Sequence, residues 1–296
     1  MTKITKAVIA AAGFGTRFLP QTKAMPKEML PLVDKPIIQY VVEELVDAGI
    51  KDIIIVTGQN KRSIEDHFDK PTEDLLANLR LAGPKKQYLL DMINQISDMA
   101  NFVYVRQKGA YGNGTPLLNV EHLLGNEPFI YTFSDDFISA TPSRFRQMIE
   151  VYNKYNSPVL CTIKATTDTD YDKYGFVVGQ EIEPGIIKAE RIVEKPGPNN
   201  KISQQATVSG YLLTADIFEY LHEANQTLQP NQELYSNQAL TLMINDHKTI
   251  IGCEIQNGKY YDAGNKLDYV KANIDFALQQ PEIHDELVQY LRSIID

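Results

Sequence analysis

The chain has 296 residues, 43% of them hydrophobic and 23% charged, and a formal net charge of −9 at pH 7. This composition is typical of a globular protein with enough core for one large domain or two modest ones. The negative charge argues against a nucleic-acid-binding surface, because such proteins present a basic face. No apolar run is long enough to cross a bilayer, and residues 1–6 do not resemble a signal peptide. We therefore expect a cytoplasmic protein that binds neither nucleic acid nor membrane.

Short apolar runs alternate with segments of helical periodicity over the first part of the chain. The strand-like runs are residues 7–12, 53–57, 102–106, 129–133 and 159–163. The helical patterns between them are residues 37–48, 61–68, 117–124 and 143–155. This alternation predicts a Rossmann-like α/β fold, with a mixed, mostly parallel sheet and helices on both faces. The leucine-rich residues 73–99 predict two helices broken at Gly83-Pro84.

The pattern changes after about Asp168, where shorter β-rich segments follow. Residues 175–178, 186–192 and 207–213 are predicted to extend the same sheet. Apolar residues recur at helical spacing in the tail from residue 265 onward, interrupted at Pro281. Such a tail packs either on the body of its own chain or on a second subunit. A homo-oligomer, either a dimer or a tetramer, is therefore an alternative that the sequence leaves open. Cys161 and Cys253 both lie in apolar runs, and we expect both to be reduced core residues.

The most informative segment is residues 6–31, KAVIAAAGFGTRFLPQTKAMPKEMLP. A continuous apolar run, of the kind buried on both faces of a sheet, breaks into the turn GFGTR at residues 13–17. Lys23 and Lys27 follow, and prolines stiffen the backbone around them. Turn amides, a guanidinium and ammonium groups on a preset loop are what binding a polyphosphate requires. The alternative is an ordinary loop with surface charges, which leaves the clustering of three cations unexplained.

Two common phosphate-binding designs do not fit this turn. A P-loop needs four residues between its glycines and a Gly-Lys-Ser/Thr ending, and the turn has neither. A dinucleotide fingerprint needs a third glycine, where Phe18 stands, and an acidic residue after the second strand, where Thr57-Gly58-Gln59 is found.

The pattern GxGTRxLPxTKxxPKEMLP, followed by VDKPIIQY at residues 33–40, closely resembles the sugar-nucleotide pyrophosphorylases and, among them, the bacterial UTP–glucose-1-phosphate uridylyltransferases. Later motifs recur in the order of that family, so the resemblance spans nearly the whole chain. They are YVRQ at 104–107, GNG at 112–114, SDD at 134–136, YG at 174–175, VEKP at 193–196 and DAGNK at 262–266. Their common order is far more specific than any one of them.

The resemblance implies a nucleotidyltransferase in which glucose 1-phosphate attacks the α-phosphorus of UTP, giving UDP-glucose and pyrophosphate. Such a transfer between anions needs in-line positioning and charge cancellation, not a covalent nucleophile. It also implies a nucleotidyltransferase domain over residues 1–264, followed by the tail at 265–296. Within that domain, residues 1–167 are expected to bind the nucleotide and residues 168–264 the sugar. Mg²⁺ is the expected cofactor.

By this resemblance, Arg17 and the turn before it should hold the β- and γ-phosphates, and Lys27 should lie near the α-phosphate. Lys27 could instead be a solvated loop lysine, and Glu28 a carboxylate in the first turn of a helix. The amide of Gln107 both donates and accepts, as the imide edge of uracil requires. The expected nucleotide-binding residues are Ala11, Ala12, Gly13, Gly15, Thr16, Arg17, Lys27, Glu28, Gln107 and Gly112.

Asp135 and Asp136 follow an apolar run, at the end of a strand where parallel sheets open their ligand crevice. Mg²⁺ takes one or two carboxylates, with phosphates supplying other oxygens. The resemblance places Asp135 and Asp262 on the metal, whereas Asp136 is expected to be a cap. It places the sugar at Gly175, Glu194, Lys195 and Ser209, although an exposed Glu-Lys pair is usually only solvated surface. The expected catalytic residues are Arg17, Lys27, Asp135 and Lys195.

The chain departs from the family pattern around the base and the sugar. Residues 112–116 read GNGTP where Gly-Leu-Gly-His-Ala is usual, residues 233–238 read ELYSNQ for Glu-Ile-Gln-Leu-Thr-Asp, and residues 208–211 read VSGY for Val-x-Gly-x-Tyr. Three alternatives therefore stay open: a dTTP-using enzyme, an enzyme for another hexose, and a catalytically weak regulatory paralogue that binds sugar nucleotide. The chain retains the charged residues that the reaction needs to balance the charge of its substrates, namely Arg17, Lys27, Asp135, Lys195 and Asp262. This retention favours an enzyme over the regulatory paralogue. The five histidines have no metal-ligand spacing, so no zinc site is expected.

Overall fold

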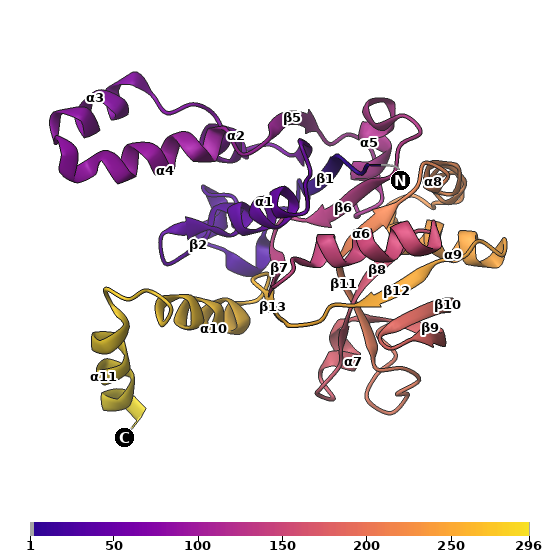
Figure 1. Cartoon of the computed structure of the whole chain (residues 1–296). Coiled ribbons are helices and arrows are strands. Elements are labelled where there is room, and N and C mark those ends of the chain that lie inside the picture. Colours follow the sequence, from indigo (N-terminus) through magenta and orange to yellow (C-terminus); the bar gives the residue numbers. More distant parts are fainter. Residues whose placement is uncertain (1–2, 296) are drawn as a thin grey trace.

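A nine-stranded mixed sheet runs through the middle of the molecule in the computed structural model, which describes residues 3–295 (Figure 1). The strand order is β5-β4-β1-β6-β11-β8-β12-β10-β9. In chain order its strands are β1 (Lys6–Ala11), β4 (Asp52–Thr57), β5 (Asn101–Arg106), β6 (Phe129–Phe133), β8 (Val159–Lys164), β9 (Gly175–Glu183), β10 (Ile186–Glu194), β11 (Gln205–Leu213) and β12 (Ile251–Glu254). Two short antiparallel pairs lie outside it, β2 (Pro31–Leu32) with β3 (Lys35–Pro36) and β7 (Asp136–Ala140) with β13 (Gly258–Asp262).

The strands β5, β4, β1 and β6 are parallel; β4, β1 and β6 are buried on both faces, whereas β5 is a partly exposed edge strand. Side chains alternate along each strand, so Val8 and Ile54 enter one core while Ile9 and Ile53 enter the other. A strand covered on both sides must be apolar at every position, which is why these runs are continuous in the sequence. The predicted mostly parallel sheet between two helical layers is confirmed.

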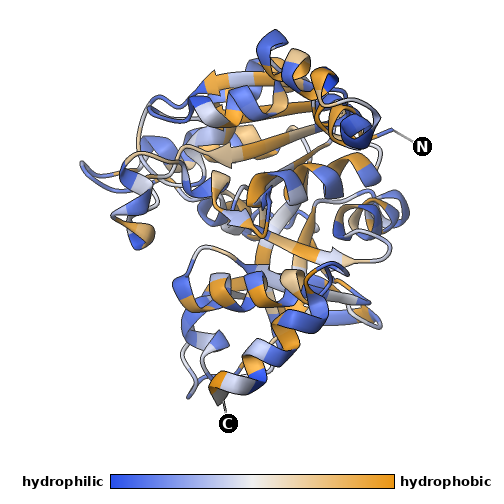
Figure 2. Cartoon of the chain, turned by 90° about the vertical axis from the view of Figure 1, so that its left-hand side faces the viewer, coloured by the Kyte–Doolittle hydropathy of each residue, from blue (hydrophilic) through white to orange (hydrophobic). Residues whose placement is uncertain are grey.

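Two groups of helices cover the two faces of the sheet. The face of Ile9 is covered by α1 (Ile37–Asp47), α2 (Arg62–Phe68), α6 (Arg144–Tyr155) and α10 (Lys266–Ala277). The face of Val8 is covered by α5 (Thr115–Leu124), α8 (Ile217–Gln226) and α9 (Ser236–Asn245). Apolar residues concentrate on the strands and on the inner faces of these helices (Figure 2). The shorter helical segments are η1 (Thr16–Phe18), η2 (Gln21–Lys23), η3 (Lys27–Met29), η4 (Pro84–Lys86) and α7 (Asp170–Lys173).

One strand lies where the sequence did not predict it. β9 and β10 extend the sheet at its edge, as expected, but β11 lies in the centre between β6 and β8 and is antiparallel to both. The expectation of a peripheral extension is therefore wrong for β11. Its burial pattern, with every residue from Val208 to Leu213 buried, is that of a central strand.

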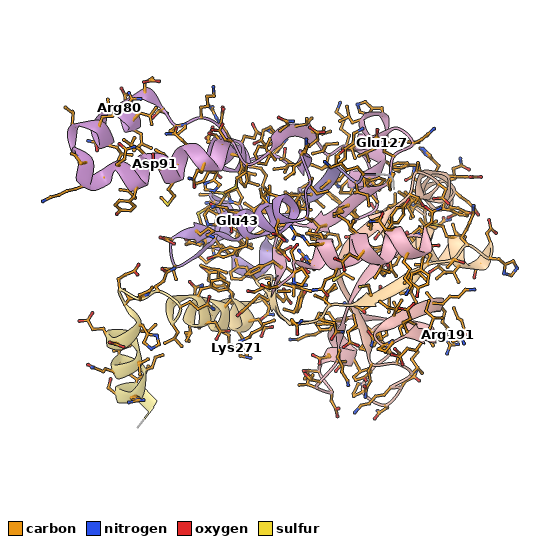
Figure 3. The ribbon with its side chains drawn as sticks, viewed as in Figure 1. Glu43, Arg80, Asp91, Glu127, Arg191 and Lys271 are labelled. Atoms are coloured by element: carbon orange, nitrogen blue, oxygen red, sulfur yellow. The ribbon has the colours of Figure 1, made fainter. Side chains whose placement is uncertain are left out.

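Two helical arms leave the body on the same side (Figure 1). In the first, α3 (Glu73–Leu81) and α4 (Gln87–Ser97) pack on each other through Leu76, Leu79 and Leu90. Gly83, at a φ of 72°, and Pro84 separate them, so the predicted break is confirmed. In the second, α11 (His284–Ile295) follows α10 after an interruption that includes Pro281. Charged residues such as Arg80 and Asp91 on the first arm lie at the periphery (Figure 3).

Cys161 and Cys253 are neighbours across the β8–β12 ladder, and both are buried and free. Burial raises the pKa of Cys253 to about 12, which keeps its thiol protonated. The prediction of two reduced core cysteines is confirmed. Within residues 3–295, every helix is too short or too polar to cross a bilayer.

Candidate active site

The turn after β1 is held in shape by its own side chains. Gly15 has a φ of 66°, and a Cβ placed on it would lie 3.1 Å from both Lys27 Cβ and Thr22 Cγ2. Thr22 Oγ1 donates a hydrogen bond to the Gly15 carbonyl at 2.7 Å. Glycine is therefore required here by both conformation and space. The turn leads into η1, which carries Thr16 and Arg17, and then into η2 and η3.

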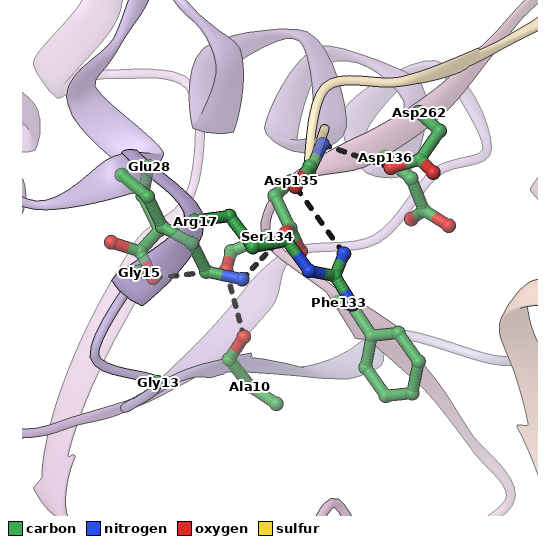
Figure 4. Close-up of polar contacts among 12 residues, drawn as sticks. Ala10, Gly13, Gly15, Arg17, Glu28, Phe133, Ser134, Asp135, Asp136 and Asp262 are labelled. Atoms are coloured by element: carbon green, nitrogen blue, oxygen red, sulfur yellow. Dashed lines mark hydrogen bonds and ion pairs between the residues drawn. The ribbon is translucent and has the colours of Figure 1, made fainter. Parts of the chain in front are cut away.

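A buried ion pair fastens this loop to the segment between β4 and α2. Lys61 Nζ lies 2.6 Å from Glu28 Oε2 and also donates to the Gly13 carbonyl at 2.7 Å. The two side chains are only 6% and 0% exposed. Ser134 Oγ donates to Ala10 O at 2.8 Å, and Glu28 lies beside it (Figure 4). Burial raises the pKa of Glu28 against the effect of Lys61, and burial lowers the pKa of Lys61.

Glu28 lies in η3, and its carboxylate is turned inward onto Lys61. The side chain of Glu28 has no exposed surface in this arrangement, and binding of the nucleotide by Glu28 stays a prediction. The sequence reasoning missed Lys61 altogether. Lys61 is 33 positions from Glu28, and a single lysine before a predicted helix carries no signal that it is buried.

Four charged side chains from distant segments meet beside this loop. Lys27 Nζ lies 2.5 Å from Asp135 Oδ2, and Arg17 donates to the Gly264 carbonyl at 3.3 Å (Figure 4). Asp262, at the end of β13, accepts from the Gly264 amide at 2.8 Å. Burial opposes the charge on Lys27, but Asp135 and Glu28 outweigh it and raise the pKa of Lys27. The amino-terminal loop and the two aspartates predicted for the metal thus share one location.

The donors at this point fit a hard divalent cation. A Cβ built on Gly264 would lie 2.9 Å from Asp262 Oδ1 and 3.0 Å from Asp135 Oδ2, so two carboxylate oxygens flank one small space. No group of three or more His, Cys, Asp or Glu side chains suited to a metal occurs within residues 3–295. Two carboxylates leave the other coordination positions to water and phosphate oxygens, which is the arrangement that Mg²⁺ favours.

Asp136 is not a cap, so that expectation is wrong. It is the first residue of β7, pairs in register with Asp262 and is 7% exposed. Its carboxylate accepts hydrogen bonds from Tyr260 Oη at 3.0 Å and from the Ser209 amide at 3.2 Å. Burial raises the pKa of Asp136. The side chains of the adjacent aspartates therefore point in opposite directions, because consecutive side chains of an extended segment lie on alternate sides of the backbone.

A cleft opens at the carboxyl ends of β1, β4 and β5. It consists of two adjoining cavities of about 510 and 400 Å³, which share five lining residues. These are Ala12, Gly13, Phe14, Gln107 and Tyr111. The larger cavity also reaches Lys23 and Lys61, and the smaller one reaches Lys27, Asp135, Gly112 and Glu233. Phe14 and Tyr111 meet edge to face across it, with ring centroids 5.7 Å apart.

The wall of the smaller cavity is built by the two segments that depart from the family pattern. The Gly114 amide donates to Leu234 O at 2.8 Å, and the Leu234 amide donates to Tyr111 O at 2.8 Å. A Cβ on Gly112 would lie 2.1 Å from Leu234 O, so only glycine permits this approach. Asn113 Oδ1 accepts from the Ser236 amide at 2.8 Å. The unusual residues of both segments thus face each other.

The predicted sugar-binding residues divide into two groups. Gly175 and Glu194 are paired in the β9–β10 ladder, and a Cβ on Gly175 would lie 2.9 Å from Glu194 Oε1. Lys195 follows directly, exposed and at a φ of 42°, and Asn237 donates a hydrogen bond to Glu194, a contact that the sequence reasoning missed. Ser209 lies apart from them. The residue is 2% exposed, and its hydroxyl forms hydrogen bonds with Thr132 Oγ1 at 2.8 Å and with the Phe133 amide at 2.9 Å.

A family model described as nucleotidyl transferase matches residues 6–279. The fold and the cationic loop beside paired carboxylates agree with that class, so the protein is a nucleotidyltransferase. The UTP–glucose-1-phosphate uridylyltransferase YngB of Bacillus subtilis (strain 168) is 41% identical over 293 residues, covering 99% of this chain and 96% of the relative. The chain belongs to the UTP–glucose-1-phosphate uridylyltransferase family.

Solved structures of relatives agree. A crystal structure of UDP-glucose pyrophosphorylase complexed with UDP-glucose has a TM-score of 0.81 and 38% identity, covering 94% of this chain and 100% of that chain. UTP-bound UGPase from Acinetobacter baumannii has a TM-score of 0.84 and 32% identity, covering 98% of this chain and 99% of that chain.

Proposed function

We propose that this protein makes UDP-glucose and pyrophosphate from UTP and glucose 1-phosphate, with Mg²⁺ as its cofactor. The observation that carries the proposal is the meeting of Arg17, Lys27, Asp135 and Asp262 beside the cleft. Two cations and two carboxylates at one point suit a reaction that brings two anionic substrates together around a divalent metal. Membership of the family supports the choice of substrates.

In this proposal, the turn at residues 13–17 and Arg17 bind the β- and γ-phosphates and stabilise the departing pyrophosphate. The forked guanidinium can hold two phosphate oxygens at once, and the turn amides add uncharged donors. Lys27 moves from Asp135 to the α-phosphate when the nucleotide binds, because a phosphate oxygen accepts a hydrogen bond from the ammonium group as a carboxylate oxygen does. No side chain needs to form a covalent bond, since in-line attack by the sugar phosphate completes the transfer.

On the sugar side, Lys195 binds the phosphate of glucose 1-phosphate and Glu194 binds the sugar hydroxyls. The close packing of Glu194 on Gly175 supports this, because the carboxylate is held against a backbone that carries no side chain. Asp135 and Asp262 would hold Mg²⁺, which supplies charge neutralisation to the triphosphate when bound.

The proposal is tested by pyrophosphate release from glucose 1-phosphate with UTP, dTTP, ATP and GTP in turn, with Mg²⁺ present. We expect rapid release with UTP and formation of UDP-glucose. Release with dTTP but not UTP would overturn the choice of base. Turnover with UTP and another hexose 1-phosphate, but not with glucose 1-phosphate, would overturn the choice of sugar. An absence of turnover with every pair, together with tight binding of UDP-glucose, would identify a regulatory paralogue instead.

A further inference from the structure

Arg144, the first residue of α6, is completely buried although it carries a full charge. Its guanidinium donates to the Ser209 carbonyl at 2.8 Å and to the Asp136 carbonyl at 3.1 Å. It lies 3.0 Å from Glu44 Oε2, and 3.9 Å separates it from Asp136 Oδ1. Burial opposes its charge, but Glu44 and Asp136 outweigh burial and raise the pKa of Arg144. A charge is retained in a core only where several partners compensate its desolvation.

These contacts join three segments that the chain keeps far apart. Glu44 belongs to α1, Asp136 to the start of β7, and Ser209 to β11. At Ser209 the pairing of β11 with β8 is irregular, and the next residue, Gly210, has a φ of 122°. The irregular backbone frees the Ser209 carbonyl from the ladder, and Arg144 supplies the donor that this carbonyl lacks.

The segment that Arg144 holds carries Asp135 of the candidate metal site and pairs with the strand that carries Asp262. Asp135 immediately precedes Asp136, whose backbone and carboxylate are both held in the network. Asp262 is the register partner of Asp136 in the β7–β13 pair, and the Ala263 amide donates to the Asp135 carbonyl at 3.0 Å. Arg144 contacts neither Asp135 nor Asp262, yet it holds the backbone next to Asp135, and that backbone pairs with the strand that carries Asp262.

We propose that Arg144 is a positioning residue for nucleotidyl transfer, because its guanidinium sets the separation and orientation of Asp135 and Asp262. This inference rests on the proposed function and deepens it. Having no exposed surface, Arg144 cannot touch a substrate. Its effect must pass through the geometry of the two carboxylates, and the property it governs is the affinity of the site for a divalent cation. Outer partners of metal ligands generally have this role.

The test compares Arg144→Met with Arg146→Met. Arg146 lies two positions further along α6, but its side chain is 51% exposed and pairs with Asp47. We expect Arg144→Met to raise the Mg²⁺ concentration for half-maximal activity by about 10- to 100-fold, with the KM for UTP at saturating Mg²⁺ within about threefold of wild type. Arg146→Met should leave both values unchanged. A purely structural role would lower Tm without moving the metal dependence, and that result would overturn the proposal.

A second readout does not depend on turnover. Binding of Mn²⁺ in the presence of UDP-glucose, measured from the electron paramagnetic resonance signal of free Mn²⁺, should weaken about 10-fold or more in Arg144→Met. Unchanged Mn²⁺ affinity would refute positioning even if activity fell. If Arg144→Met does not fold, Glu44→Met removes one polar partner of the guanidinium while Arg144 itself is kept, and a smaller shift in the same direction is expected. Wild-type protein that binds Mn²⁺ and UDP-glucose but shows no turnover would contradict the proposed function alone.

Discussion

The buried pair of Lys61 and Glu28 allows a sharp prediction for the variant Lys61→Met. Methionine keeps the length and apolar stem of the side chain but removes the ammonium group. Glu28, whose side chain has no exposed surface, would then be an uncompensated carboxylate in the core, and the Gly13 carbonyl would lose its donor. The turn at residues 13–17 would also lose its tether to the segment between β4 and α2.

The cost follows from the burial of the two partners. Removing one member of a buried pair costs about 3–5 kcal/mol, because the remaining charge is neither solvated nor paired. For a domain of this size that corresponds to a drop in Tm of about 10 °C. Lys35→Met is a matched control, since Lys35 pairs with Glu43 at 2.9 Å but the two side chains are 32% and 36% exposed. An exposed pair of this kind contributes less than about 1 kcal/mol.

The assay is thermal and urea unfolding of the two single variants and of Glu28→Gln/Lys61→Met. We expect the double variant to regain most of the stability lost in Lys61→Met, because it removes the unpaired charge. The defect of Lys61→Met should be larger at pH 8 than at pH 5. Burial raises the pKa of Glu28, so at low pH the carboxyl can take up a proton and stay buried without a partner. Lys61→Met with a wild-type Tm at pH 8, or a double variant no more stable than the single one, would refute this reasoning.

Three further predictions concern the cleft and its surroundings. Asp135→Asn should lower kcat at least about 100-fold while leaving Tm within a few degrees, because a neutral amide cannot hold the cation; near-normal turnover would remove Asp135 from the metal site. Gly112→Ala should lower Tm and raise the KM for UTP, because its Cβ would lie 2.1 Å from a carbonyl oxygen. Gly49→Ala, at a similar positive φ but with nothing within 4 Å, should cost only about 1–2 kcal/mol in unfolding and nothing in KM, and equal effects would contradict the clash. Burial raises the pKa of Glu44 to about 8, so the free energy of unfolding of the wild type should fall as pH rises from about 5 to 8. Glu44→Gln should flatten that curve, and parallel curves in urea unfolding would show that Glu44 is ionised throughout.

Local sequence patterns predicted most of the secondary structure, because the preferences that form a strand, a helix or a turn act between residues that are close in the sequence. Continuous apolar runs indicated β1 and β4, and Gly83-Pro84 indicated the break between α3 and α4. The position of β11 could not be predicted in this way. Its pairing with β6 joins Tyr211 to Tyr131, and nothing in either sequence records the partner.

In the candidate site, too, some residues could be predicted from the sequence and others could not. Motif order brought attention to Arg17, Lys27 and the two aspartates, and the structure places them together. Lys61 and Arg144 were missed because a buried cation looks the same in a sequence as a solvated one. Arg144 and Arg146 stand two residues apart on one helix, yet one is fully buried and the other half exposed. Only the three-dimensional position of Glu44 and Asp136 distinguishes them.

The central antiparallel strand has a mechanical consequence. β11 is hydrogen-bonded to β6 on one side and to β8 on the other, so one continuous sheet joins the two halves of the molecule. Rotating one half of the molecule against the other would break several backbone hydrogen bonds, each of which contributes a net stabilisation of about 1 kcal/mol. Admission and release of substrates must therefore fall to the surface loops at residues 13–26, 107–114 and 233–237, while the floor beneath them stays rigid.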